Sequence, residues 1–507
     1  MKISDIHPRL LADCREKGID IDHSLEILDF VNARSQASKT DSTDKGCAAA
    51  PELPAPEDPR IVSAEGDRSL VISASRAREA FGEFALPPAL LERARPAPAS
   101  SGSVVFDEEL LREIGRRLYP RAAFGVLNGG SATSYADTKK NRAVDEAAFD
   151  AVKDDFERLA ARFRGQPKGI TPAYFNEDGS DGPSFLELKF RALLIEAAAC
   201  RALEDAPSAD ILPVFQMSSD GTREALAETY RTYRNSPYLK DLIERTACDP
   251  TKVLDATQPL LAALSPAKED GTRGIFDRAW GREHSALPLP GGHGENFRVL
   301  KGVYQGLREK GIRFAWLGNV DNSGYTVDPV SLATLALSGR CAAFEFSGKS
   351  ALDVKGGVLV KDGERLSVRD IGQSISWDEI HAAEERGGRA VFNCATGLFD
   401  LDYLVPRLDE ISRKLPLHVT EQNKEAGHYA QAEQTTWEVL GLLDAPLILT
   451  VPRAKRFLPA KMLLETLMAS PRTAKLKDNE AIPRAVREDG ERLRLAMKAL
   501  LEEKCAI

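Results

Sequence analysis

The stretch that decides the fold is Phe124-Gly-Val-Leu-Asn-Gly-Gly-Ser-Ala-Thr-Ser134. An apolar run of the strand type stops at an asparagine and two glycines, and small hydroxyl residues follow. Glycines after a strand let the backbone turn sharply and bring its N–H groups close to an anion. A helix that begins just beyond would add its positive end. The pattern predicts a phosphate site, with nucleotide phosphate as the preferred ligand, but a strand-to-helix turn that needs glycines only for its geometry would read the same.

Outside this stretch, helical and strand patterns alternate from residue 107 onward. A helix capped by Asp107 precedes the first strand. Further strands are expected at 211–217, 313–317, 342–346 and 390–392, and helices at 222–234, 296–310 and 329–337. Such alternation predicts a mostly parallel sheet with helices on both faces. Ligands of these sheets bind at the carboxyl ends of the strands, where Gly129, Met217, Asp321 and Glu345 are expected to lie.

The composition limits the class of protein. The 507 residues are 43% hydrophobic and carry a formal net charge of −9, and no long basic run suggests a nucleic-acid partner. An anionic substrate must then be held by a few local lysines and arginines. Seven scattered cysteines without a CxxC pair argue against a disulfide scaffold or a zinc site. With no signal peptide and no apolar span of membrane length, a cytoplasmic protein with no membrane partner is expected.

Three segments stand outside this alternation. Residues 36–58 are rich in Ser, Ala, Asp and Pro, and we expect a disordered linker there. Residues 358–368 predict a hairpin that turns at Asp362-Gly363. The charged stretch 483–504 predicts a terminal helix that Gly490 could break.

Five short motifs occur in order along the chain. They are Leu127-Asn-Gly-Gly130, Pro290-Gly-Gly-His-Gly-Glu295, Gly318-Asn-Val-Asp-Asn322, Asp353-Val-Lys-Gly-Gly357 and Arg456-Phe-Leu-Pro-Ala-Lys461. Together they resemble the UTP–glucose-1-phosphate uridylyltransferase (UDP-glucose pyrophosphorylase) family over about residues 107 to 470.

The resemblance implies an α/β fold of the glycosyltransferase-A-like nucleotidyltransferase kind, with a mixed, mostly parallel sheet. It implies a catalytic nucleotide- and sugar-binding domain at 104–430 and a C-terminal region at 431–507 that contributes a catalytic lysine. Residues 1–103 are then an N-terminal accessory region. We find no hexapeptide periodicity, so no C-terminal β-helix is expected, and the chain would be a monomer or a small homo-oligomer.

The implied reaction is nucleotidyl transfer. An oxygen of glucose 1-phosphate attacks the α-phosphorus of UTP, so UDP-glucose forms and pyrophosphate leaves. The enzyme must align two polyanions and neutralise charge, which calls for backbone amides, lysines and Mg²⁺ rather than a catalytic Ser, Cys or His. A UDP-sugar or UDP-N-acetylhexosamine pyrophosphorylase and a non-catalytic UDP-sugar-binding protein stay open as alternatives. A dehydrogenase of the Rossmann type is disfavoured, because the chain has no GxGxxG followed by a ribose-binding acid.

The resemblance assigns this chemistry to a few charged residues. Lys461, after a strand expected at 446–451, would bridge the sugar phosphate and the α-phosphate, a task that suits a compact ammonium group. Asp321 would hold Mg²⁺, although a structural Asn/Asp turn is the alternative. Lys139 or Lys140 would meet the leaving pyrophosphate; the sequence does not choose between them, and a solvated face would also explain the pair.

The remaining predicted site residues would bind the nucleotide and the sugar. His293, between glycines, would contact the substrate near its phosphates. Ala132 stands in place of the family's third loop glycine, and Ala395 and Thr396 replace asparagines near the sugar, which leaves the sugar's identity open. The predicted substrate-binding set is Leu127, Asn128, Gly129, Gly130, Thr133, Met217, Gln258, Gly292, His293, Gly294, Asn319, Asn322, Glu345, Lys355, Gly356 and Asn393.

Overall fold

A computed structural model describes the protein at residues 2–40, 52–58, 60–64, 66–97, 102–203, 211–350, 356–372 and 374–507. The side chains of residues 37–40 are outside that description.

A ten-stranded sheet forms the centre of the described structure. Its main path runs β1 (Ile61–Ser63), β17 (Pro446–Thr450), β11 (Ala342–Ser347), β14 (Phe392–Asp400), β10 (Phe314–Asn319), β5 (Ala122–Leu127), β6 (Val214–Ser219) and β7 (Leu254–Gln258). Neighbours on this path are parallel except around β14, which is antiparallel to both β10 and β11. The predicted fold class, a mixed and mostly parallel sheet with helices, is confirmed.

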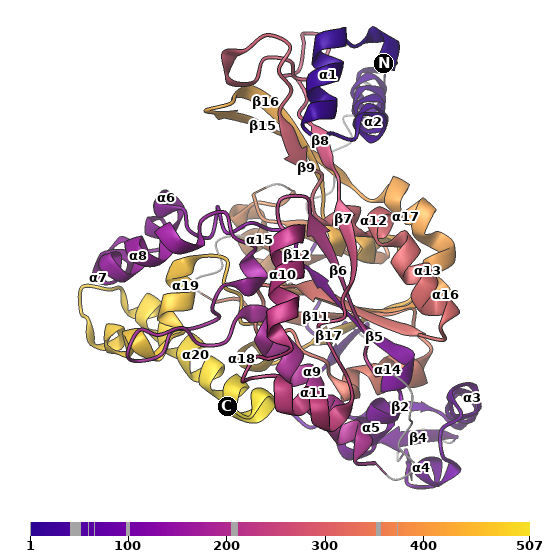
Figure 1. Ribbon diagram of the computed structural model, residues 1–507. Coiled ribbons are helices and arrows are strands. Elements are labelled where there is room, and N and C mark those ends of the chain that lie inside the picture. The colour runs from indigo at the N-terminus through magenta and orange to yellow at the C-terminus, as the bar shows by residue number, and fades with distance from the viewer. Residues whose placement is uncertain are drawn as a thin grey trace.

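Helices cover both faces of this sheet, so each face is closed by its own hydrophobic cluster (Figure 1). One cluster contains residues of α5 (Glu108–Arg117), α9 (Phe185–Arg201), α10 (Arg223–Tyr233), α11 (Lys240–Thr246) and α14 (Pro329–Ser338). The other contains residues of α12 (Asn296–Val299), α13 (Lys301–Glu309), α16 (Leu401–Leu404) and α17 (Leu408–Lys414).

Local sequence explains the best predicted elements. Asp107 caps α5 by accepting a 3.0 Å hydrogen bond from the Leu110 amide, and Leu110, Leu111 and Ile114 are buried on one face. The predicted hairpin is β12 (Gly357–Asp362) and β13 (Arg365–Asp370), which turns through Gly363 at a φ of +59°. β12 also pairs with β14, so the hairpin extends the sheet, and α15 (Trp377–Glu385) follows it.

The described elements before residue 104 that lie outside the central sheet fall into two groups. α1 (Pro8–Glu16) and α2 (Ile21–Thr40) share a hydrophobic cluster with β8 (Leu260–Ala262), β15 (Leu417–Lys424) and β16 (Gly427–Gln434), and β9 (Pro288–Pro290) pairs with β8. These elements form the knob at the top of Figure 1. β2 (Leu70–Ser73), α3 (Ala74–Phe84), α4 (Pro88–Glu92), β3 (Arg95–Pro96) and β4 (Ser103–Phe106) lie at the opposite end, next to α5 and α14. The domain boundary at residue 103 stays a prediction.

The predicted linker is shorter than expected. Residues 36–40 complete α2, while Leu53 is 7% exposed because it packs in a cluster with β12 and α15. Residues 41–51 of that linker lie outside the described residues.

An excursion from the glycine loop builds a further lobe. The chain leaves at Ser131 and returns at Pro167, and a β-bridge joins these two residues. Between them lie α6 (Thr138–Arg142), α7 (Glu146–Ala151) and α8 (Lys153–Phe163), which pack against α19 (Leu463–Met468). α20 (Arg484–Leu500) continues through Gly490 without the break that the sequence suggested. The glycine lets the helix pack closely on α19, since a Cβ added there would lie 2.7 Å from Met468 Cε.

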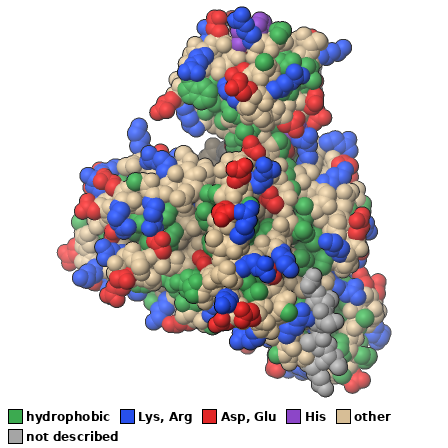
Figure 2. Space-filling view, in the orientation of Figure 1, with side chains coloured by type: hydrophobic (Ala, Val, Ile, Leu, Met, Phe, Trp, Pro, Cys, Tyr) green, Lys and Arg blue, Asp and Glu red, His purple; other side chains and the backbone are tan. Residues whose placement is uncertain are grey.

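The surface view in Figure 2 shows positive and negative side chains interspersed, with no broad field of one sign on that face. Among the described helices, none combines the length and the apolar character that a membrane span needs.

Candidate active site

A cleft of about 510 Å³ opens at the carboxyl end of β10. β14 runs antiparallel and begins at the same edge, so both strands deliver polar residues there. The predicted residues that line the cleft are Lys140, His293, Asn319, Asp321, Asn322, Gly356, Asn393 and Lys461. Residues that the motifs place far apart in sequence therefore meet in one space.

Asp321 and a lysine that the sequence analysis missed form the charged centre. The Nζ atom of Lys168 lies 3.2 Å from Asp321 Oδ2, donates a short hydrogen bond to the Ala460 carbonyl and lies 4.7 Å from the centre of the Tyr135 ring. Burial acts to raise the pKa of Asp321, but Lys168 and Lys461 outweigh it and hold that pKa below its usual value. Asp321 is therefore a carboxylate at neutral pH.

Lys461 is tied to Asp321 through the backbone. The Ala460 amide donates to the Asp321 carbonyl at 3.0 Å, and the Leu458 amide donates to Asn322 Oδ1 at 2.9 Å. Asn322 Nδ2 donates in turn to the Arg456 carbonyl at 3.0 Å. The Asn322 side chain is 1% exposed, and through these hydrogen bonds it connects the motif at 318–322 to the motif at 456–461. Lys461 itself is exposed in the cleft.

His293 is fixed as a neutral donor. Its Nδ1 accepts a 3.0 Å hydrogen bond from the Thr436 amide, which leaves the proton on Nε2 in the neutral ring. Its carbonyl accepts from Thr436 Oγ1 at 2.8 Å and from Asn296 Nδ2 at 2.9 Å. Burial lowers the pKa of His293 below its usual value. An Nε2–H donor on the cleft wall suits an anionic or hydroxyl-bearing ligand.

The glycine loop follows β5, Gly129 and Gly130 are not among the residues that line the cleft, and the helix beyond the loop is short. Leu127 ends β5, the buried Asn128 donates to Gln216 Oε1 at 3.1 Å, and the Gly129 carbonyl accepts from Ser219 Oγ at 2.8 Å. The Gly130 carbonyl accepts from the Lys168 amide at 3.1 Å, while the exposed Thr133 contacts Ser131. The helix beyond, α6, has five residues, and the carboxylate of Asp137 caps its N-terminus. The positive helix end expected for a phosphate is thus occupied by the chain itself.

The residues expected near the base lie on β6 and β7, beyond β5 from the strand that precedes Asp321. Met217 is 2% exposed and Gln258 6%. Gln258 Nε2 donates to the Gly292 carbonyl at 2.8 Å, which joins β7 to the histidine turn. Gly292 has a φ of +87°, and an added Cβ would lie 2.4 Å from the Gln434 carbonyl. Gly294 packs on Gln434 in the same way, so both glycines let the turn approach β16.

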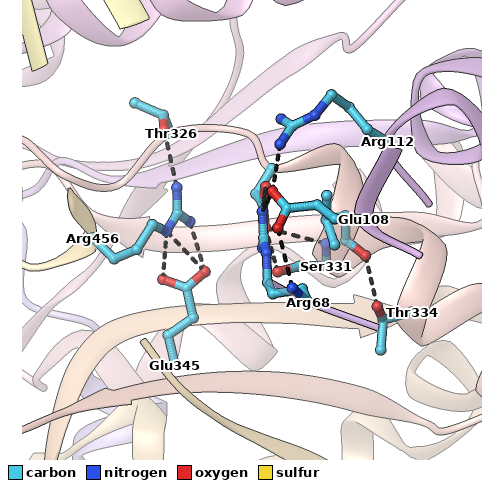
Figure 3. A network of polar contacts seen from close by, with 10 residues as sticks. Arg68, Glu108, Arg112, Thr326, Ser331, Thr334, Glu345 and Arg456 are labelled. Atoms are coloured by element: carbon cyan, nitrogen blue, oxygen red, sulfur yellow. Dashed lines mark hydrogen bonds and ion pairs between the residues drawn. The ribbon is translucent and has the colours of Figure 1, made fainter. Parts of the chain in front are cut away.

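Glu345, expected near sugar hydroxyls, lies in a buried ion pair. Both of its carboxylate oxygens accept from Arg456, at 2.7 Å from Nη2 and 3.0 Å from Nε, and Arg456 Nη1 donates to Thr326 Oγ1 at 3.0 Å (Figure 3). Burial acts to lower the pKa of Arg456, but Glu345 and Asp328 outweigh it and keep that pKa above its usual value. In this arrangement Glu345 supports the loop that carries Lys461 and does not line the cleft.

Only one of the two adjacent lysines of α6 lines the cleft. Lys140 lines the cleft and its Nζ donates to Ser134 Oγ at 2.7 Å, whereas Lys139 is exposed and is not among the cleft residues. Gly356 and Asn393 line the cleft, and Lys355 lies outside the described residues.

Several residues of the site escaped sequence reasoning. Besides the buried Lys168, which contacts Asp321, these are the cleft residues Asp370, at the end of β13, Trp437 and Glu465. Burial raises the pKa of Asp370 above its usual value. The one available signal was Gly165-Gln-Pro-Lys-Gly169, a glycine-flanked lysine after a helix, but nothing local showed that it returns to the loop at Gly130.

The donor set fits a hard cation such as Mg²⁺. Asp321 contributes a carboxylate, and Asn319 Oδ1 is a buried carbonyl oxygen without a hydrogen-bond partner among the described residues. No cluster of three or more His, Cys, Asp or Glu side chains suited to a metal occurs in the described part of the chain. A cation bound through few protein oxygens and completed by substrate phosphates is the arrangement that Mg²⁺ prefers.

Comparisons with known proteins point to one family. The model of the UTP–glucose-1-phosphate uridylyltransferase family matches residues 271–498. Over that range, 228 of the 507 residues, the chain is similar to this family. The match contains the histidine turn, Asp321 and Lys461.

Relatives in the UTP–glucose-1-phosphate uridylyltransferase family are distant. The enzyme of that name from Solanum tuberosum is 25% identical over 181 residues, which cover 35% of this chain and 38% of that protein. The Musa acuminata enzyme is 24% identical over 261 residues, 51% of either protein. A structure of Leishmania major UDP-glucose pyrophosphorylase with UDP-glucose covers 70% of this chain and 66% of that one, at 18% identity and a TM-score of 0.49. The chain thus spans 38% and 51% of the two curated relatives.

Proposed function

We propose that the protein is a uridylyltransferase that makes UDP-glucose and pyrophosphate from UTP and glucose 1-phosphate. The observation that carries the proposal is the meeting of Lys168, Asp321 and Lys461 at one edge of the sheet. Two cations around one carboxylate are suited to two bound polyanions and a metal ion.

In the proposed reaction an oxygen of the sugar phosphate forms a bond to the α-phosphorus of UTP while the bond from that phosphorus to the bridging oxygen breaks. Lys461 would hold the attacking and α-phosphates, because it is exposed in the cleft and tied through Ala460 to Asp321. Lys168 would meet the phosphates of the leaving pyrophosphate, since its amide is bonded to the glycine loop. These charges stabilise the transition state.

Asp321 and Asn319 would hold Mg²⁺, which supplies charge neutralisation on the triphosphate when bound. The Nε2–H of His293, another residue of the cleft, would donate to a substrate oxygen. Asp370 and Asn393 lie on the β12–β14 side of the cleft, and their oxygens would accept from sugar hydroxyls.

A pyrophosphate-release assay with UTP, Mg²⁺ and a panel of sugar 1-phosphates tests the proposal. We expect turnover with glucose 1-phosphate, and a fall in kcat by a factor of about 10²–10³ in Lys461→Ala. Lys455→Ala is the matched control, because Lys455 is 65% exposed at its side chain and lies outside the cleft. Preference for an N-acetylhexosamine 1-phosphate would keep the chemistry and replace the sugar. UDP-glucose binding without any turnover would identify a binding protein instead.

A further inference from the structure

Trp437 offers a hydrogen-bond donor that the fold leaves unused. The residue is 5% exposed and lines the cleft, and its Nε1–H has no hydrogen-bond partner among the described residues. Indole N–H groups are normally paired when buried. The unpaired donor of a residue that lines the cleft is therefore a candidate contact for a ligand or an ordered water.

Two contacts hold the indole in place. Trp437 follows Thr436, which is bonded to His293 by both its amide and its hydroxyl, and the two rings lie 6.4 Å apart between centroids. On the other side the benzo ring packs on β14, where a Cβ added to Gly397 would lie 3.3 Å from Trp437 Cζ3. The N–H is thus fixed in advance, which lowers the cost of binding.

The position of Trp437 in the cleft indicates which substrate it meets. The nucleotide residues Asn128, Met217 and Gln258 are on β5, β6 and β7, to one side of Asp321 along the sheet. Asn393 and Asp370 belong to the strands on the other side, and Trp437 lines the cleft with them. A sugar joined to the α-phosphate near Asp321 would extend toward this second group.

We propose that Trp437 determines the sugar specificity of the site. Its N–H donates to a hydroxyl oxygen of the hexose, complementing the acceptors Asp370 and Asn393. Its ring takes the space that a bulky ring substituent would need, so the site takes an unsubstituted hexose 1-phosphate and rejects an N-acetylhexosamine 1-phosphate. This inference rests on the uridylyltransferase function proposed above.

Two substitutions separate the donor from the bulk. Trp437→Phe removes the N–H and retains most of the ring, so we expect kcat/KM for glucose 1-phosphate to fall about ten-fold with the KM for UTP unchanged. Trp437→Ala also opens the wall, so the preference for glucose 1-phosphate over N-acetylglucosamine 1-phosphate should fall a further ten-fold or more, as pocket fit alone discriminates by about 10–200-fold. Trp280→Phe, at a site 52% exposed beside the turn between β15 and β16, is the control.

Deoxyglucose 1-phosphates identify the hydroxyl. One deoxy analogue should be a poor substrate for the wild type, and Trp437→Phe should lose most of that discrimination while the other analogues keep theirs. The inference would be overturned if both Trp437 variants kept the wild-type sugar selectivity. It would also be overturned if the only change were in the KM for UTP.

Tryptophan fluorescence keeps the test independent of turnover. UDP-glucose should quench the wild type more than UDP does, and the difference should vanish in Trp437→Phe but persist in Trp280→Phe. If the wild type turns over no sugar phosphate, the proposed function fails. The difference in quenching between UDP-glucose and UDP then tests by itself whether Trp437 contacts the sugar. An equal response of wild type and Trp437→Phe would reject its contact with the sugar.

Discussion

Lys168 shows how one side chain can belong to a site without carrying a recognisable motif. It is 7% exposed, and its ammonium group contacts Asp321, the Ala460 carbonyl and the Tyr135 ring. Burial of a lysine is costly unless its charge is paired. Asp321 offsets that cost, so the fold holds the ammonium group beside a carboxylate that lines the cleft.

Replacing Lys168 by Ala should reduce kcat by a factor of about 10²–10³, because one preorganised donor to the leaving group is lost. The KM for the sugar phosphate should change less, since Lys461 remains. Steady-state pyrophosphate release measures both quantities. Lys139→Ala, which changes an exposed lysine outside the cleft, should retain wild-type kcat; equal losses in the two variants would argue against a role at the cleft.

Glu345 gives a second prediction at this scale. Because it is the buried partner of Arg456, Glu345→Ala leaves a buried guanidinium group without that carboxylate, and the free energy of unfolding should fall by about 3–5 kcal/mol. Urea unfolding measures this change. Glu410→Ala, at an exposed pair with Lys414, should stay within about 0.5 kcal/mol. A raised KM for the sugar phosphate with unchanged stability would instead assign Glu345 to the sugar.

Among the elements, α2 reaches from the N-terminal knob to the histidine turn. The Nε2 atom of His23 lies 3.0 Å from Glu295 Oε2, and the Glu295 side chain is 3% exposed. Asp20, Glu26 and Arg298 also face this pair. The helix thus supports the turn that carries His293, two residues before Glu295.

The pair predicts a pH-dependent stability. Burial acts to lower the pKa of His23, but the hydrogen bond and charge of Glu295 outweigh it and raise that pKa above its usual 6.5. A raised folded-state pKa contributes stability that is fully present below about pH 6.5 and is lost as the pH rises through the folded value. His23→Gln keeps a donor but no charge, so its loss of stability in urea should be larger at pH 6 than at pH 9. A loss that is equal at both pH values would exclude a charged His23.

On the scale of the whole molecule, segments distant in sequence share one core. The cluster on one face of the sheet contains residues from Ala64 to Cys505. β1 pairs with β17, and Arg68 contacts Asp328 at 2.5 Å between Nη1 and Oδ2. Figure 3 shows Arg68 beside Glu108, with which it also forms an ion pair. The segment before residue 104 therefore completes the body that holds the cleft.

A chain that begins at residue 104 should consequently lose cooperative unfolding, because it exposes the surfaces that β1, α3 and Arg68 cover. Circular dichroism during urea titration measures the transition. A chain that begins at residue 41 removes the knob helices alone and should keep a cooperative, though weaker, transition from the sheet. Independent folding of residues 104–507 with wild-type stability would contradict this account.

The sequence by itself determined the alternating architecture, the helix at α5 and the β12–β13 hairpin, because caps, turn residues and apolar spacing act over a few neighbours. It also singled out the glycine loop, His293, Asp321 and Lys461 as candidates, since each lies in a short motif at the end of an element. Only the tertiary structure decided that Lys168 returns beside Asp321, that Glu345 pairs with Arg456 and that Trp437, a cleft residue, has an N–H without a partner among the described residues. These features depend on contacts between residues more than 100 positions apart or on the absence of a partner, and no local pattern encodes either.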